Sequence, residues 1–183
     1  DLTIGQGWQT TKHVRGMGDV NGDGKEDIIA IGDSQTFVAL STGTSFSTKQ
    51  VWISSQAFTY NGTWRVETHP RVFADVNGDG KTDLIGFSHW ETQVALSTGT
   101  GFSNPTPWHN GFDAISGWQV GRHSRQVYDI NGDGKADIVG FGEKSVEVAF
   151  SEGNKFSDIT QIVDLGFTAE NNYGSTNSVR LVG

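Results

Sequence analysis

The sequence of 183 residues contains no cysteine, so it can form no disulfide bond, and cysteine usage gives no indication of compartment. It has no apolar run near the roughly 18 residues that a membrane-spanning helix needs, so we expect no membrane span. Lys and Arg are scarce, with 13 against 21 Asp and Glu, and they form no cluster. Because the formal net charge is −8, nucleic acid is not an expected partner.

Helical signals are weak as well, since no apolar stripe with the helical period is longer than about two turns. Glycine is abundant instead, with 25 residues, and hydrophobic residues make up 34% of the chain. This composition favours an all-β fold of many short strands and turns, and the length allows a single core. The chain begins at Asp1 without a signal-peptide pattern, from which we expect a processed or trimmed form.

An acidic motif of nine residues occurs three times, at 19–27, 75–83 and 129–137. Each copy reads D-x-N-x-D-G-x-x-D and places oxygen-bearing side chains at positions 1, 3, 5 and 9. Ca²⁺ prefers six to eight oxygen ligands, and the carbonyl of the Lys at position 7 can add one more. The sequence therefore predicts three Ca²⁺ sites. The expected ligands are Asp19, Asn21, Asp23, Lys25, Asp27, Asp75, Asn77, Asp79, Lys81, Asp83, Asp129, Asn131, Asp133, Lys135 and Asp137.

These acidic loops differ from an EF-hand, which needs a bidentate Glu at position 12. Position 12 is Ala30, Gly86 or Gly140 here, inside an apolar run. Short β-rich runs on both sides favour a hairpin with the cation in its turn, and the glycine at position 6 would allow positive φ at the bend. A plain Asp/Asn/Gly-rich turn without metal is the alternative. Three copies with identical ligand positions favour the metal site.

The acidic loops are part of a longer internal repeat, because they start 56 and then 54 residues apart. A Trp-x₄-His-x-Arg motif keeps the same phase upstream of each loop, beginning at Trp8, Trp64 and Trp118. The whole chain, 1–183, therefore reads as one segment of tandem units. The repeats run at about 8–63, 64–117 and 118–172, with a partial repeat at 173–183.

Each repeat offers about four strands, with the acidic loop joining the first two. In the middle repeat we expect them at Arg71–Asp75, Asp83–Phe87, Thr92–Ser97 and Thr106–Phe112. Such units are typical of β-propeller blades, and the partial repeat supplies one orphan strand, Val179–Val182. Three blades do not close a ring, since propellers usually have four to eight. We therefore expect missing N-terminal blades or another chain to complete it.

The stretch from Trp64 to Phe87, WRVETHPRVFADVNGDGKTDLIGF, resembles the Psathyrella velutina lectin family, seven-bladed propellers of the integrin-α-like type with FG-GAP or VCBS repeats. The third repeat matches through Asp137–Glu143, and the resemblance suggests the C-terminal part of such a propeller. It implies pockets between blades that bind N-acetylglucosamine and related sugars, structural Ca²⁺ and a secreted, extracellular protein. The sequence departs from the pattern at 88–90, which reads Ser-His-Trp, and in the partial repeat, which lacks the Trp and His.

The Trp-x₄-His-x-Arg motif also suits a sugar chemically. A Trp ring can stack on the apolar face of a pyranose, while His and Arg can hydrogen-bond hydroxyl or acetamido groups. An acid that follows the second strand in the first and third repeats can accept from hydroxyls. The alternative is that the repeated Trp and His form structural layers between blades. The candidate sugar-binding residues are Trp8, His13, Arg15, Trp64, His69, Arg71, Trp118, His123, Arg125, Asp33 and Glu143.

No motif indicates an enzyme, since the sequence contains neither G-x-S-x-G nor H-E-x-x-H and its Asp residues are mostly committed to the loops. Repetition favours binding, because several weak sites add avidity. We therefore predict a non-enzymatic lectin for glycans of the N-acetylglucosamine type. The alternatives are an integrin-like or toxin-associated propeller that binds proteins, and a polysaccharide lyase propeller.

Overall fold

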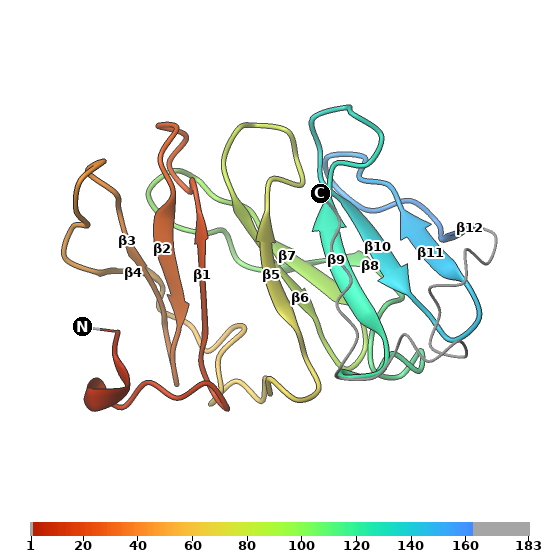
Figure 1. Cartoon of the computed structure of the whole chain (residues 1–183), viewed down its shortest axis with the longest axis horizontal. Coiled ribbons are helices and arrows are strands. Elements are labelled where there is room, and N and C mark those ends of the chain that lie inside the picture. Colours follow the sequence, from red (N-terminus) through yellow and green to blue (C-terminus); the bar gives the residue numbers. More distant parts are fainter. Residues whose placement is uncertain (1, 163–183) are drawn as a thin grey trace.

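The computed structural model describes residues 2–162, which form a short 3-10 helix, η1 (Ile4–Gln6), and twelve β-strands (Figure 1). The expected orphan strand Val179–Val182 lies outside the described residues. Within residues 2–162, no helix has the length and apolar character to cross a membrane. The strands are β1 (Val14–Gly18), β2 (Asp27–Ile31), β3 (Thr36–Ala39), β4 (Gln50–Ile53), β5 (Arg71–Ala74), β6 (Asp83–Phe87), β7 (Thr92–Ala95), β8 (Thr106–His109), β9 (Ser124–Tyr128), β10 (Asp137–Phe141), β11 (Val146–Ala149) and β12 (Thr160–Ile162).

The strands form three separate antiparallel sheets of four, each in sequence order. The acidic loop joins the first two strands of every sheet, as the sequence predicts, and Gly24, Gly80 and Gly134 take φ of 81°, 78° and 84° at the bend. The fourth strand of the middle sheet is shorter than expected and ends at His109 rather than Phe112. Phe112 has a φ of 58° and a fully buried ring, so the chain turns inward there instead of continuing the strand.

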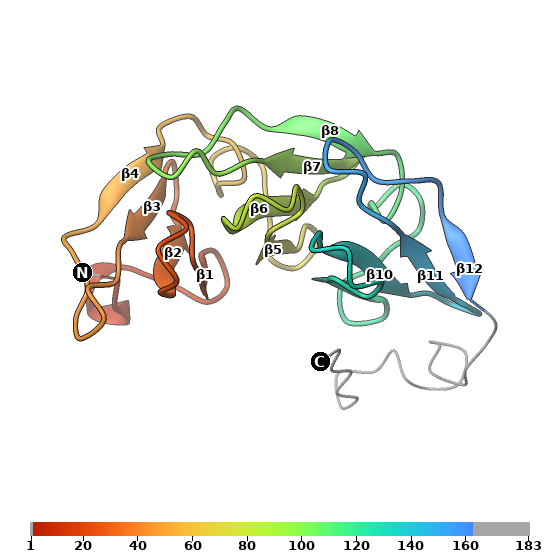
Figure 2. The ribbon, with the colours of Figure 1, turned by 90° about the horizontal axis from the view of Figure 1, so that it is seen from above.

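The three sheets stand side by side along an arc, with β1, β5 and β9 on its inner side and β4, β8 and β12 on its outer side (Figure 2). This arrangement confirms the prediction of four-stranded propeller blades. Apolar side chains fill the space between neighbouring blades. Trp52 on β4, for example, is buried and meets Phe102 of the next blade edge to face at 5.3 Å, which confirms a packing role for this Trp.

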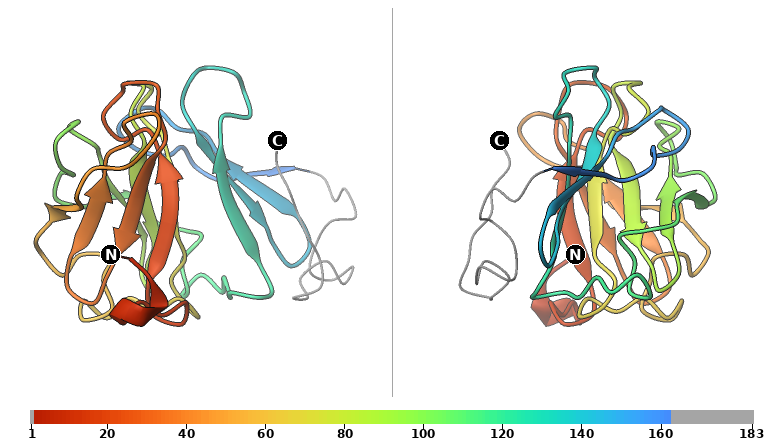
Figure 3. Two further views of the ribbon diagram at one scale, coloured as in Figure 1. Left: turned by 60° about the vertical axis from the view of Figure 1, so that its left-hand side comes forward. Right: turned by 90° about the vertical axis from the view of Figure 1, so that its right-hand side faces the viewer.

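The two ends of each blade differ in their content. The three acidic loops lie together at one end (the top in Figures 1 and 3). The segments that carry Trp8, Trp64 and Trp118 lie at the opposite end, together with the turns that join the second and third strands of each blade. Metal chemistry at the loops and ligand binding at the Trp segments would therefore occur at separate places.

Hydrogen bonds join the acidic loop of one blade to the next blade. The amide of Thr82 donates to the Asp19 carbonyl at 2.7 Å, and the Ser97 hydroxyl donates to the carbonyl of Val20. The next junction repeats both bonds. The amide of Ala136 donates to the Asp75 carbonyl at 2.8 Å, and the Ser151 hydroxyl donates to the Val76 carbonyl. Val20 and Val76 are fully buried under these contacts. Each of the first two loops therefore belongs to two blades.

Replacing Ser97 or Ser151 by Ala should lower the free energy of unfolding by about 1–2 kcal/mol, because a buried carbonyl loses its donor. Ser41→Ala is the matched control, since the Ser41 hydroxyl accepts only the Gly43 amide among the described residues. Denaturant unfolding followed by Trp fluorescence measures the difference. Equal losses of unfolding free energy in all three variants would show that the bonds between blades do not contribute to stability.

Candidate functional site

Each repeat has a pocket at the Trp-bearing end of its blade, lined by the repeat's Trp and His and by the turn between the second and third strands. The cavities measure about 340, 260 and 560 Å³ in the first, second and third repeats. We refer to them as pockets 1, 2 and 3. The resemblance implies pockets between blades. The turn that faces each Trp and His comes from the same repeat, and residues just before that repeat, such as Phe112 and Ser116 in pocket 3 or Gly62 and Thr63 in pocket 2, also line the pocket.

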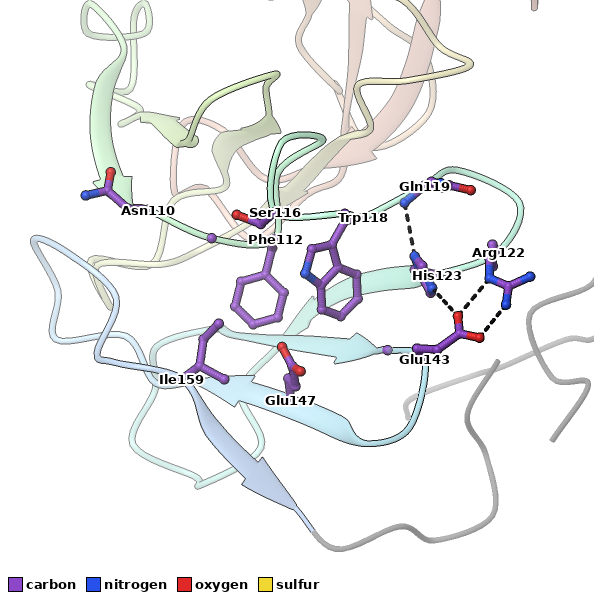
Figure 4. A pocket seen from close by; sticks show the side chains of 13 residues that line it. Asn110, Phe112, Ser116, Trp118, Gln119, Arg122, His123, Glu143, Glu147 and Ile159 are labelled. Carbon is purple, nitrogen blue, oxygen red and sulfur yellow. Dashed lines mark hydrogen bonds and ion pairs between the residues drawn. The ribbon is translucent and has the colours of Figure 1, made fainter. Parts of the chain in front are cut away.

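Pocket 3 is built around Trp118, His123 and Glu143 (Figure 4). His123 Nδ1 accepts the amide of Gln119 at 3.1 Å, and its Nε2 lies 3.1 Å from Glu143 Oε2. Arg122 Nε donates to the same carboxylate oxygen at 2.8 Å, and Arg122 Nη2 donates to the other. The hydrogen bonds from Arg122, and then the bond from His123, lower the pKa of Glu143 to about 2. Glu143 is therefore an ionised and fully paired side chain.

The same histidine geometry recurs in pocket 1, where His13 Nδ1 accepts the Gln9 amide at 3.0 Å and Nε2 meets Asp33 Oδ1 at 3.1 Å. The spacing between histidine and acid is 20 residues in both repeats, a regularity by which the sequence could have revealed the pair. The amide on Nδ1 leaves the proton on Nε2, where it donates to the acid. The expected sugar-accepting acids thus first serve to orient a histidine.

Pocket 2 differs because the turn residues that line it are Ser88, His89 and Trp90, none of them an acid. Glu91, the last residue of this turn, lies outside the lining and accepts a hydrogen bond from Gln93 Nε2 at 2.8 Å. His69 Nδ1 accepts the Arg65 amide at 3.2 Å, as in the other repeats. Burial, and then the charge of Arg71, lower the pKa of His69, so the ring is neutral at physiological pH. Trp90 is 67% exposed at the rim, as predicted for a turn residue.

The repeated Trp side chains line the pockets mainly as packed walls. Trp118 is 7% exposed, its ring centroid lies 5.0 Å from that of Phe112, and it covers Gly140. Trp8 and Trp64 are equally buried. Little of each Trp ring is therefore exposed for stacking against a sugar ring. Its main role is to form a wall of the pocket.

The repeated Arg side chains do not line the pockets. Arg125 is buried, lies 5.9 Å from the centroid of Trp118 and donates to the Phe112 carbonyl at 2.8 Å. Arg71 donates to the His69 carbonyl at 2.7 Å, and Arg15 to the Leu2 carbonyl at 2.9 Å. Burial lowers the pKa of Arg71 and of Arg125 to about 10. These residues hold the connecting segment against the blade.

Sequence reasoning missed several lining residues. The second residue of the third strand lines every pocket, as Phe37, Gln93 or Glu147. Lys49 lines pocket 1, and Arg122 lines pocket 3. Phe37, Gln93 and Glu147 hold the same position in the three repeats but differ in residue type. A repeat position at which the residue type varies could have indicated a ligand-facing side chain.

In the acidic loops, the Asp at position 9 is fully buried in every repeat. Asp83 Oδ2 accepts the Val76 amide at 3.1 Å, and Oδ1 accepts the Ser97 amide at 2.7 Å. Asp27 and Asp137 repeat both bonds. Burial raises the pKa of Asp83 to about 7 and also raises that of Asp137. This carboxylate links two loops of one blade.

The Asp residues at positions 1 and 5 face the loop interior and rim. Asp19 accepts the amides of Gly22 and Gly24, each at 2.7 Å, while Asp23 pairs with the Lys25 ammonium at 2.8 Å. Among residues 2–162, no group of three or more His or acidic side chains is gathered as around an ion. The donor chemistry nonetheless fits a hard cation, since each loop offers three carboxylates and an Asn amide oxygen.

Comparisons with known proteins bear on the fold and the repeat. Residues 19–86 match the model of the FG-GAP-like repeat. The chain is similar to the structure of an Agrocybe aegerita lectin that specifically recognises non-reducing terminal N-acetylglucosamine, with a TM-score of 0.84 and 34% identity over 91% of the chain. The chain spans 42% of the length of that lectin. A comparison with curated proteins finds no match.

Two toxin assemblies share the fold at lower identity. The Photorhabdus luminescens Tc holotoxin pore aligns with a TM-score of 0.62 and 18% identity, over 81% of this chain and 7% of that one. A TcdB2-TccC3-Cdc42 complex aligns with a TM-score of 0.56 and 19% identity, over 71% and 6%. At such identity the likeness concerns the blade architecture alone.

Gly140→Ala should destabilise the protein by about 1–3 kcal/mol, because a Cβ there would overlap the rings of Trp118 and Phe112. In a Trp118→Phe background the same change should cost less, since the smaller ring relieves part of the overlap. Denaturant unfolding of the four proteins of this double-mutant cycle measures the coupling. Strictly additive losses would mean that Trp118 does not pack on Gly140.

Proposed function

We propose that this chain is a non-enzymatic, carbohydrate-binding propeller segment that binds terminal N-acetylglucosamine-type sugars in pockets 1 to 3. The similarity to the N-acetylglucosamine-recognising lectin carries the proposal, because it extends over the repeats that contain all three pockets. Kinship with the Psathyrella velutina lectin family is part of the same proposal.

The pockets have features that suit a sugar ring. Their volumes of about 260–560 Å³ admit a small ligand, and each combines aromatic walls with a few fixed polar groups. In pockets 1 and 3 the histidine orients an acid at the rim, and the carboxylate oxygens have further lone pairs that can accept from a sugar hydroxyl. Three related sites on one chain suit a multivalent glycan surface, where avidity adds to single-site affinity.

We propose that the three acidic loops bind Ca²⁺ through the ligands that the sequence predicts. A bound cation would supply positive charge beside the carboxylates at positions 1, 5 and 9. The Lys at position 7 pairs with the position 5 carboxylate, as Lys81 does with Asp79 at 2.7 Å, so its ammonium competes with an ion for this carboxylate. Because the loops and the pockets lie at opposite ends of the blades, this role is structural.

An extracellular location and further blades, from the same chain or another, complete the proposal. The blade surfaces support the second point. Phe156 and Phe102 pack on Trp108 and Trp52 of the preceding blade, whereas their counterpart Phe46 is 43% exposed. A neighbouring blade would cover Phe46 in the same manner.

His123→Ala should weaken sugar binding at pocket 3 by about tenfold or more, because it removes a ring that lines the pocket and orients Glu143 at its rim. Titration with methyl N-acetyl-β-glucosaminide, followed by NMR shifts of residues in each pocket, measures this directly. His109→Ala serves as the control, since His109 lies outside the three pockets. Unchanged binding in His123→Ala would place the sugar elsewhere.

Removing Ca²⁺ with EDTA should lower the melting temperature, because a ligand at about 100 times its Kd contributes ~2.7 kcal/mol per site. Lys81→Met should tighten Ca²⁺ binding at the second loop, since it removes the competing ammonium. Calorimetric titration and thermal melts measure both effects. A protein that contains no metal by elemental analysis and melts identically with EDTA would refute the calcium proposal.

A further inference from the structure

The three pockets share their frame but differ in charge. The charged residues that line pocket 1 are Asp33 and Lys49, which balance, and no Asp, Glu, Lys or Arg lines pocket 2. Pocket 3 contains Arg122, Glu143 and Glu147, so it carries one negative charge in excess when its histidine is neutral. The difference between the pockets therefore centres on one carboxylate.

Glu147 is the source of that excess. Arg122 already neutralises Glu143, and His123 bonds the same carboxylate, so the charge of Glu143 is balanced within the pocket. Glu147 lies on β11 and points toward Phe112 and Trp118 from below (Figure 4). Its one hydrogen bond within residues 2–162 comes from the Ser145 hydroxyl at 3.4 Å, which is a long bond from an uncharged donor.

The repeat alignment shows that this carboxylate is not required by the strand. Gln93 holds the same position on β7, in the same register of the same hairpin, and Phe37 holds it on β3. A neutral amide and an apolar ring therefore fit the blade at this place. Since packing does not demand an acid, Glu147 is free to serve the ligand.

We propose that pocket 3 selects hexosamines with a free 2-amino group, such as glucosamine units, and that Glu147 is the residue that determines this preference. The inference rests on the proposed sugar-binding function and assigns pocket 3 its own ligand class. The carboxylate accepts a charge-assisted hydrogen bond from the sugar ammonium, which is stronger than a bond from a neutral acetamido N–H.

A cationic peptide is the competing ligand class for a carboxylate in a pocket. The repeated frame argues for the sugar, because the histidine, its acid and the Trp wall recur in pocket 1, where no carboxylate remains unpaired. The charge at Glu147 therefore modifies a pocket that is built for the same ring in another repeat.

The test compares methyl β-glucosaminide, at a mildly acidic pH at which its amine is protonated, with methyl N-acetyl-β-glucosaminide. Glu147→Gln should weaken binding of the amino sugar at pocket 3 by about tenfold and leave the N-acetyl sugar within about twofold. Gln is a safe replacement because Gln93 occupies this position on β7. Gln93→Glu should in turn give pocket 2 measurable affinity for the amino sugar. NMR titration of the full chain assigns each change to its pocket.

The outcomes separate this inference from the broader proposal. If the N-acetyl sugar binds but Glu147→Gln leaves amino-sugar binding unchanged, the inference is wrong and the lectin proposal stands. If neither sugar binds, both are wrong. Binding of a blocked lysine peptide that depends on Glu147, without binding of the amino sugar, also overturns the inference.

Discussion

The buried Asp at position 9 of each acidic loop holds the blade together at the loop end. Asp83 accepts hydrogen bonds from the Val76 amide of its own loop and from the Ser97 amide just after β7, so one carboxylate fixes two turns. Ser97 then donates its hydroxyl to Val20 of the preceding blade. A continuous chain of bonds thus runs from a loop carboxylate to the neighbouring sheet, and burying that charge is tolerated because both oxygens are bonded.

The pockets depend on the same rigidity, although they lie at the other end. Strands held in register by the loops end in turns at fixed positions, and these turns bring Asp33 or Glu143 to the histidine of the repeat. Arg15 and the buried Arg125 complete the frame by donating to backbone carbonyls of the connecting segments. Ion binding and sugar binding are therefore separate proposals that share one scaffold.

Much of the fold could be predicted from the sequence, because each strand and loop pattern occurs three times. Strand positions and the positive φ of Gly80 follow from local pattern. The structural role of the repeated Arg could not be predicted, since only the structure shows that Arg125 packs near Trp118 and bonds a backbone carbonyl. Glu147 escaped notice because, in a strand of alternating residues, a charged side chain reads as solvent-facing.

We propose that each described repeat presents one sugar pocket, lined by its Trp, its His and the turn of its own blade. A crystal structure of the chain grown with methyl N-acetyl-β-glucosaminide tests this most directly. We expect a sugar ring against Trp118, within hydrogen-bonding distance of Glu143, and corresponding rings in the other two pockets. A sugar bound at the acidic loops or on the outer strands, with these pockets filled only by water, would contradict it.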